Sequence, residues 1–122
     1  MIKQFALVGL GGALGSMLRY ATSLLTAKYY ANTFPLATFI TNILGCFIIG
    51  LLMGYFGKNS NQQLQLLFIT GFCGGYTTFS TFAAENIALW QNQNYFSLIC
   101  YVAASVIVGC FAVWLGLILI KF

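Results

Sequence analysis

Long apolar stretches separated by short polar clusters make up nearly the whole chain. Four of these stretches are long enough to cross a membrane, at about 2–27, 34–56, 64–90 and 95–120. A spanning helix needs about 20 mainly apolar residues, so each stretch predicts a transmembrane helix. The polar clusters between them, such as 57–61, are only a few residues long. We therefore predict an all-α membrane protein with a single transmembrane domain over residues 1–122 and no extramembrane domain.

The third stretch predicts a broken helix. Adjacent glycines at 74–75 and adjacent threonines at 77–78 make a poor helix interior. Broken helices at membrane depth occur only where the freed backbone groups are buried in protein or line a wet cavity. Carbonyls freed between Gly74 and Thr78 are suited to bind a cation, while the following half-helix presents the positive end of its dipole. The alternative is a simple glycine kink, and composition favours neither.

Composition narrows the functional class. Of the 122 residues, 61% are hydrophobic and 5% are charged, against about 25% charged in soluble domains. Too few charged side chains remain to cover a soluble fold, which excludes a soluble enzyme or a nucleic-acid-binding protein. The net charge of +4 comes from five scattered cations and one acid, Glu85, so there is no basic patch. The chain has no histidine, and its four cysteines lie in apolar runs, where we interpret them as packing residues rather than a metal or redox site.

Small residues recur at helical spacing, which indicates close contact between helices. Gly11 and Gly15 form a G-x-x-x-G pattern in the first stretch. Cys46, Gly50 and Gly54 repeat every four residues in the second stretch. Both sets predict helix faces that pack against a neighbouring helix.

The positive charges are divided almost evenly between the two membrane faces. With four spans, the face that holds both termini carries Lys3, Lys58 and Lys121. The opposite face carries Lys28, joined by Arg19 if its side chain reaches that way. Such a weak bias sets no single orientation. We therefore expect insertion in both orientations and assembly of an antiparallel homodimer.

Polar residues adjoin two phenylalanines just after the predicted break. The polar side chains of this segment are Thr77, Thr78, Ser80, Thr81 and Glu85. Phe79 and Phe82 lie one turn apart on the neighbouring helix face. Aromatic rings have positive edges, so rings turned edge-on beside hydroxyls favour an anion pathway. The alternative is core packing by the phenylalanines, with the hydroxyls bonded to their own backbone.

Further polar residues lie within the other apolar stretches. The Asn42 amide is suited to donate to an anion or, alternatively, to form an interhelical hydrogen bond. Arg19 either attracts anions to a vestibule or extends its side chain to the membrane interface. Tyr101 and Ser105 share a helix face, either as packing residues or as hydroxyl donors. Because donors outnumber acids in the predicted spans, we expect an anion pathway rather than a cation pathway.

The whole chain resembles the CrcB/Fluc family of small fluoride channels. The resemblance rests on the length, the four spans and three motifs: Gly-Gly-Ala-Leu-Gly-Ser-Met-Leu-Arg-Tyr at 11–20, Thr-Asn-Ile-Leu-Gly-Cys-Phe at 41–47 and Gly-Phe-Cys-Gly-Gly-Tyr-Thr-Thr-Phe-Ser-Thr-Phe at 71–82. The last motif is highly specific. The resemblance implies a dual-topology antiparallel homodimer in the inner (plasma) membrane of the cell. Through its two pores, toxic fluoride would leave the cytoplasm.

The resemblance also implies roles for individual residues. Those that match pore-associated positions are Phe79, Phe82, Asn42, Ser80, Thr81, Tyr101, Ser105, Glu85 and Arg19. Among them, Ser80 and Thr81 match a hydroxyl track, and Arg19 matches a vestibule arginine. The main-chain carbonyls of Gly74 and Thr77 match the ligands of a structural sodium ion at the dimer interface. The resemblance leaves open the individual roles of Glu85, Tyr101 and Ser105.

Two other functions suit a small protein with four spans. One is a proton-coupled exporter of the small multidrug-resistance type. A resemblance to that type would imply an acidic residue midway along the first span. Residues 2–27 contain no Asp or Glu. The other is a non-transporting scaffold protein. The sequence holds no catalytic pair, so we expect no enzymatic activity, and the expected partners are fluoride, a second copy of the chain and the lipid bilayer.

Overall fold

Helices make up almost all of the described chain. The computed structural model describes the backbone of residues 1–121 and the side chains of residues 1–120. In chain order its elements are α1 (Ile2–Tyr29), α2 (Leu36–Lys58), α3 (Gln62–Gln65), the π-helix η1 (Leu66–Cys73), α4 (Gly74–Tyr76), α5 (Phe79–Gln91) and α6 (Tyr95–Lys121). No β-strand occurs among residues 1–121, so the all-α prediction is confirmed.

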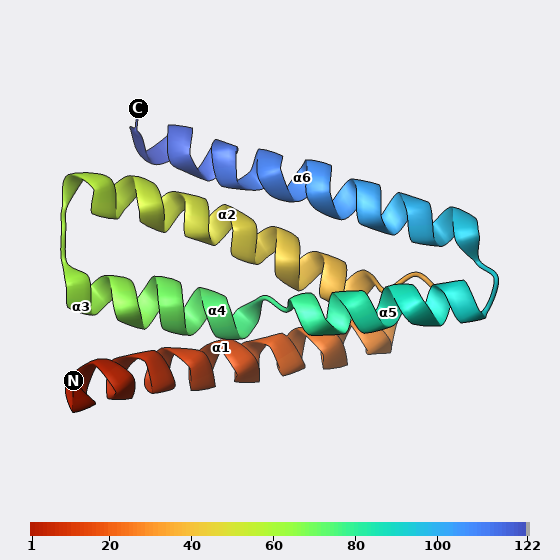
Figure 1. The fold of residues 1–122 in the computed structure, drawn as a ribbon, viewed down its shortest axis with the longest axis horizontal. Helices are drawn as coiled ribbons and strands as arrows, with labels where there is room; N and C mark the ends of the chain where they lie inside the picture. Colours follow the sequence, from red (N-terminus) through yellow and green to blue (C-terminus); the bar gives the residue numbers. More distant parts are fainter. Residues whose placement is uncertain (122) are drawn as a thin grey trace.

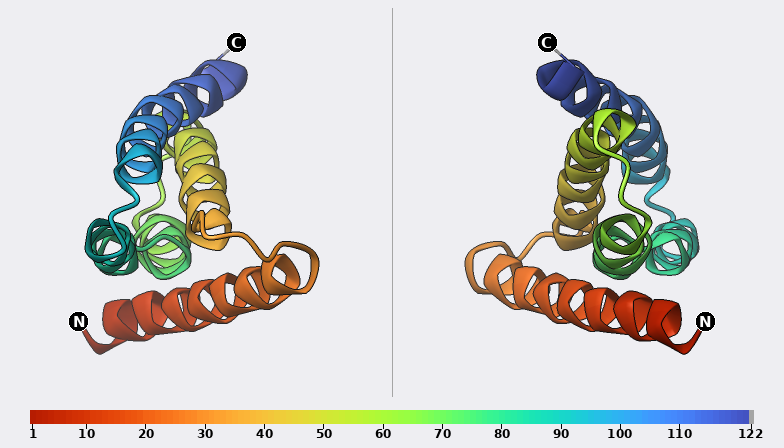
Figure 2. Two further views of the ribbon diagram at one scale, coloured as in Figure 1. Left: turned by 90° about the vertical axis from the view of Figure 1, so that its right-hand side faces the viewer. Right: turned by 90° about the vertical axis from the view of Figure 1, so that its left-hand side faces the viewer.

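The elements form four long rods (Figure 1). α3, η1 and α4 follow one another without a gap, and α5 continues in the same direction after a short break. These four elements together are called the broken rod. α1 packs chiefly against η1 and α4, whereas α2 packs chiefly against α6. Figure 2 shows α1 along one side of the bundle and the α2–α6 pair on the other side of the broken rod. The prediction of four helices with a broken third one is confirmed.

The break lies at Thr77 and Thr78, which are both extended. Their φ/ψ angles are −87°/158° and −150°/124°. The first half of the rod ends at Thr77, whose N–H and Oγ1 both donate to the carbonyl of Cys73, at 3.0 and 2.9 Å. The second half begins after Thr78, whose Oγ1 accepts from the N–H of Thr81 at 3.3 Å, as N-cap residues do. Each half is capped separately, so the alternative of a simple glycine kink is wrong.

α1 and the first half of the broken rod meet through glycines. A Cβ atom at Gly15 would lie 2.8 Å from the amide nitrogen of Tyr76. A Cβ atom at Gly11 would lie 3.1 Å from the Cα of Gly71. Because backbone occupies the space that a larger side chain would need, the predicted packing role of the G-x-x-x-G pattern is confirmed.

α2 and α6 also meet through small residues. A Cβ atom at Gly50 would lie 3.0 Å from the Cα of Val113. A Cβ atom at Gly54 would lie equally close, 3.0 Å, to the Cβ of Ile120. The sulfur of Cys46 lies 3.5 Å from the position that a Cβ at α6 residue 109 would take. The predicted small-residue face of the second helix is therefore confirmed.

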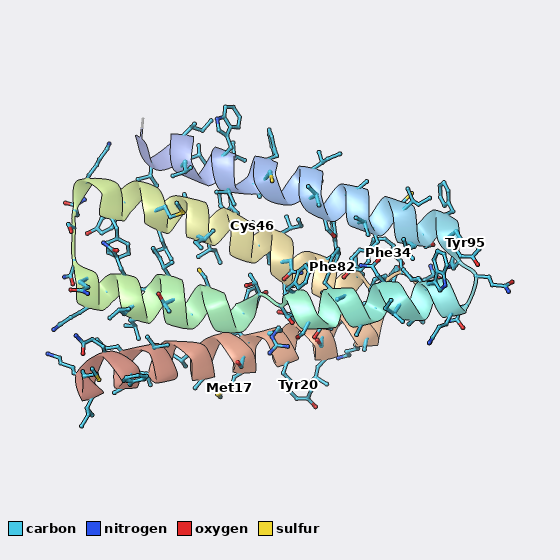
Figure 3. The ribbon with its side chains drawn as sticks, in the orientation of Figure 1. Met17, Tyr20, Phe34, Cys46, Phe82 and Tyr95 are labelled. Carbon is cyan, nitrogen blue, oxygen red and sulfur yellow. The ribbon has the colours of Figure 1, made fainter. Side chains whose placement is uncertain are left out.

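Hydropathy distinguishes the helices from one another. α2 and the 95–120 part of α6 have mean hydropathies of 2.2 and 2.5, and among the described helices these two are long and apolar enough to cross a membrane by length and composition. The third predicted span is divided by the break. Apolar side chains also face outward from α1, where Met17 and Tyr20 are each 66% exposed and point away from the bundle (Figure 3). Apolar surface on all sides of a helix is typical of a membrane protein.

Candidate functional site

A groove of about 470 Å³ lies between α2, the broken rod and α6. Several of the predicted site residues line it: Asn42, Gly74, Thr77, Phe79, Phe82 and Ser105. The structure therefore brings the helix break, both phenylalanines and one predicted residue each from α2 and α6 to a single cavity. The remaining predicted residues do not belong to its lining; they are Arg19, Ser80, Thr81, Glu85 and Tyr101.

The two phenylalanines form the start of an aromatic series that crosses the groove. The ring centroids of Phe79 and Phe82 are 5.9 Å apart, and the Phe82 ring lies 4.9 Å from that of Tyr101. Phe82 points from α5 toward α2 and α6 (Figure 3). Phe79 is 78% exposed. The pair thus reaches from the interior of the protein to its open surface.

Asn42 binds the backbone of the break with both ends of its side chain. Its Oδ1 accepts from the N–H of Thr78 at 2.8 Å, and its Nδ2 donates to the carbonyl of Thr78 at 3.1 Å. This is the interhelical bond that the sequence left as one of two alternatives. An amide nitrogen carries two hydrogens, so one donor of Asn42 is left over at the groove wall.

Hydroxyl groups surround the N-terminus of α5. The Thr78 Oγ1 lies 3.2 Å from the Thr81 Oγ1 and 3.4 Å from the Ser80 Oγ. Ser80 is exposed, while Thr78 and Thr81 are half-buried. A helix N-terminus carries partial positive charge. The three hydroxyls therefore lie where a negative group is stabilised.

Glu85, the only acid in the chain, is held by two hydroxyls. Its Oε2 accepts from Thr38 of α2 and its Oε1 accepts from Tyr101 of α6, both at 2.8 Å. The Tyr101 side chain is 0% exposed. Thr38 was not among the residues predicted from the sequence. Its signal was the spacing of Thr38 and Asn42, two polar residues four apart and so on one face of an apolar helix.

A second hollow, of about 670 Å³, lies on the far side of the Glu85 cluster. Glu85 lines it together with amide side chains of the connecting loops, namely Asn32, Asn92, Gln93 and Asn94. Phe82 belongs to the groove and Glu85 to this hollow, and the two residues are one turn apart on α5. The buried Tyr101 contacts both residues, so it separates the two spaces.

Ser105 and Arg19 have different surroundings. The Oγ of Ser105 is buried and has no hydrogen-bond partner among the described residues, although it lines the groove. Arg19 is half-buried, and its Nε donates to the carbonyl of Gly75 at 3.0 Å. The guanidinium therefore joins α1 to the end of the first half-helix, where a cation is favoured by the negative end of the dipole. Neither of the two alternatives for Arg19 includes this contact.

The carbonyls of Gly74 and Thr77 suit a hard cation. In an unbroken helix the Gly74 carbonyl would accept from the N–H of Thr78, but that N–H donates to Asn42 instead. Gly74 is exposed, and a Cβ built on it meets no atom within 4 Å. Backbone oxygens are good ligands for hard cations. One chain offers few of them at this place, so a complete cation site needs further ligands from outside the chain.

Comparison with known families identifies the chain. The family described as "CrcB-like protein, Camphor Resistance (CrcB)" matches residues 6–117. The chain belongs to this CrcB-like family. The matched range includes every predicted site residue and both capped halves of the broken rod.

Curated relatives of this CrcB-like chain are similar along their whole length. A "Fluoride-specific ion channel FluC" of Azobacteroides pseudotrichonymphae is 48% identical over 124 residues, covering 100% of this chain and 99% of the relative. The protein of the same name from Flavobacterium psychrophilum is 48% identical, covering 98% of each chain. That of Gloeothece citriformis is 44% identical, covering 97% of each.

Proposed function

We propose that this chain forms a fluoride-selective channel through which fluoride leaves the cytoplasm by passive flow. The observation that carries the proposal is the groove in which Phe79, Phe82, Asn42 and Ser105 meet beside the broken rod. The full-length similarity to relatives named as fluoride-specific ion channels supports the same function. The protein would act as a transporter and not as an enzyme.

The chemistry of the groove favours a small anion. Fluoride is strongly hydrated, so a pore must replace its water with closely spaced donors. The remaining Asn42 N–H, the unpartnered Ser105 hydroxyl and the edges of the Phe79 and Phe82 rings are suited to this. The one acid, Glu85, has both carboxylate oxygens engaged by hydroxyls. Larger anions would be rejected because the same donors cannot close around them.

The active form would be an antiparallel homodimer with two pores. The groove of a single chain lacks an outer wall, since Phe79 is 78% exposed and Gly74 lies open. A second copy would cover these residues and make a closed path. The weak charge bias between the two faces agrees with insertion in both orientations. We place the dimer in the inner (plasma) membrane as a multi-pass protein.

A structural sodium ion would sit where the two copies meet. The carbonyls of Gly74 and Thr77 would hold it, with matching carbonyls from the second copy completing the site. Its positive charge would fix the two broken rods against each other. The chain's own contribution is the break itself: the N–H of Thr78 donates to Asn42 and the N–H of Thr81 donates to the Thr78 hydroxyl, so the carbonyls of Gly74 and Thr77 lose their helical donors.

Fluoride efflux from liposomes tests the proposal. Liposomes loaded with potassium fluoride and containing the purified protein are treated with valinomycin, and a fluoride electrode records release. We expect rapid release without a proton gradient, and none from liposomes lacking protein. Drug–proton exchange would identify the multidrug-type exporter instead, and absence of any flux would favour the scaffold. Labelling of a C-terminal tag from both sides of the membrane tests the dual orientation, and labelling from one side only contradicts it.

A further inference from the structure

The Asn42 side chain takes the place of helical bonding at the break. In a continuous helix, the N–H of Thr78 would donate to the carbonyl of Gly74. In the structure this N–H donates to the Asn42 Oδ1 at 2.8 Å, and the carbonyl of Thr78 accepts from the Asn42 Nδ2 at 3.1 Å. One side chain therefore satisfies both backbone groups of the residue at which the helix opens.

α2 supports the break at a second point, one turn further along. A Cβ built at Gly45 would overlap the Cγ2 methyl group of Thr77. Gly45 thus leaves the space that the extended Thr77 occupies, and Asn42 lies three residues before it on the same helix face. The two residues form one surface of α2 that fits the extended backbone of residues 77–78.

The broken form of the rod competes with a continuous helix. Unpaired backbone groups are costly at membrane depth, so residues 74–78 close into a helix unless other partners are supplied. Thr77 and Thr78 cap the two ends, but neither supplies a partner for the N–H of Thr78. Asn42 is the residue that does so.

We propose that Asn42 is a positioning residue whose side-chain amide holds the broken rod open at Thr78 and thereby keeps the Gly74 carbonyl available to an alkali cation. The assignment of the cation rests on the proposed function; the control of the break by Asn42 does not. This role is distinct from donation to an anion, because it uses the acceptor Oδ1 and one of the two Nδ2 hydrogens. The asparagine of the groove is thus energetically linked to the cation site.

The expected change in sodium affinity follows from the population of the broken form. When only part of a population is competent to bind, the apparent affinity falls in proportion to the competent fraction. Removing two hydrogen bonds to the backbone reduces the population of the broken form by roughly tenfold or more. The sodium concentration needed for half-maximal binding should rise by the same factor.

Three variants separate the two roles of Asn42. Asn42→Ala removes both bonds to Thr78. Asn42→Asp keeps an oxygen that accepts the N–H of Thr78 but loses the amide donor. Asn86→Ala is the matched control, because the Asn86 amide donates only to the Phe82 carbonyl of its own helix, at 3.0 Å.

The first measurement needs neither sodium nor fluoride. Semisynthetic protein carrying ¹³C at the Gly74 carbonyl is examined by infrared spectroscopy, in which a helically bonded carbonyl absorbs at lower frequency than an unbonded one. We expect the unbonded frequency in wild type, Asn42→Asp and Asn86→Ala, and the helical frequency in Asn42→Ala. An unbonded Gly74 carbonyl in folded Asn42→Ala would overturn the positioning role. If Asn42→Ala does not fold, a helical frequency in Asn42→Asp overturns it.

The second measurement follows stabilisation by sodium. Thermal unfolding of the purified protein is recorded while sodium replaces N-methylglucamine. We expect roughly tenfold more sodium for half of the stabilisation in Asn42→Ala than in wild type and Asn86→Ala. An unchanged sodium requirement in Asn42→Ala together with reduced fluoride flux would make Asn42 only an anion donor and overturn the link. Absence of a sodium effect in wild type would refute the cation site itself, leaving the infrared result to decide the role of Asn42 at the break.

Discussion

The α2–α6 pair and the broken rod are built in opposite ways. α2 and α6 are continuous, strongly apolar helices that meet backbone to backbone at positions such as Gly50. The broken rod contains a π-helix, two extended residues and a cluster of hydroxyls. Three polar side chains of the continuous pair bind the broken rod: Thr38 and Tyr101 bind Glu85, and Asn42 binds Thr78.

The difference assigns structural support to the α2–α6 pair and the polar chemistry to the broken rod. Continuous helices satisfy their own backbone groups, so α2 and α6 use small residues for contact and have polar side chains to spare. The broken rod leaves backbone groups that need partners from neighbouring helices. The groove and its donors therefore occur where the chain departs from regular helix. Side chains of the regular helices bind the broken segment and keep it in position.

The largest expected effect is on ion flux through the groove beside the broken rod. Phe79→Ile and Phe82→Ile keep an apolar side chain but remove the positive ring edge. We expect fluoride efflux from liposomes to fall by roughly tenfold or more in each variant, because about 1.4 kcal/mol of lost barrier stabilisation already gives this factor. Phe111→Ile, on the outward face of α6, is the control and should be nearly wild type. Gel filtration checks that each variant elutes as the wild-type protein does. Wild-type flux in both groove variants would assign these rings to ordinary packing.

A second effect, on stability and not on flux, is expected from crowding the α2–α6 contact. Gly50→Val places methyl groups against the backbone of Val113, and overpacking of this kind costs about 1–3 kcal/mol. Gly57→Val is the matched change, since a Cβ there meets no atom within 4 Å. The thermal unfolding temperature in detergent should fall clearly after the first change and only slightly after the second. Equal effects would contradict the assignment of Gly50 to the helix contact.

Loss of the Tyr101 hydroxyl should weaken the bond between α6 and the broken rod. Tyr101→Phe leaves one oxygen of the half-buried Glu85 without its donor, at a cost of about 1 kcal/mol. Tyr95→Phe is the control, because Tyr95 is 46% exposed and its ring packs on Trp90. Chemical unfolding of both variants measures the difference, and a loss of stability as large in Tyr95→Phe would count against the role of the Glu85 cluster.

The smallest effect concerns the cap of α5. Thr78→Ala removes the oxygen that accepts the N–H of Thr81, and loss of an N-cap costs about 1 kcal/mol. Thr78→Ser keeps a hydroxyl and should retain most of that stability. Unfolding measurements on the two variants, compared with wild type, give the contribution of the cap. If serine and alanine behave alike, the cap bond contributes nothing to the break.

The sequence predicted what depends on composition and spacing. Apolar runs of spanning length gave the four helices, and the Gly-Gly and Thr-Thr pairs marked the break, because both features act locally. The recurrence of Gly11 and Gly15 predicted a packing face without naming its partner. Those partners, η1 and α4, depend on which helices lie side by side, and no single stretch of sequence specifies this.

The partners of the polar side chains were harder to predict for the same reason. Asn42 was predicted as a polar residue with either an anion or an interhelical partner, but its bonds to Thr78 join residues 36 apart in the chain. The contact of Arg19 with Gly75 and the bonds that hold Glu85 also cross between helices. The π-helix η1 had no clear signal, because its apolar residues suit an α-helix equally well. The roles of individual residues in ion flow remain predictions for the experiments above.

The pairing of helices has a consequence for synthesis in the cell. Neighbours in sequence are usually neighbours in space, yet α1 packs chiefly on η1 and α4, and α2 chiefly on α6. As the chain emerges, the glycine face of α1 lacks its partners until the third rod is made, and α2 lacks its chief partner until the last helix is complete. The helices therefore complete their packing in the bilayer only late in synthesis. A ribosome that stops before α6 releases a chain whose second helix still exposes its small-residue face to lipid and to quality-control proteases.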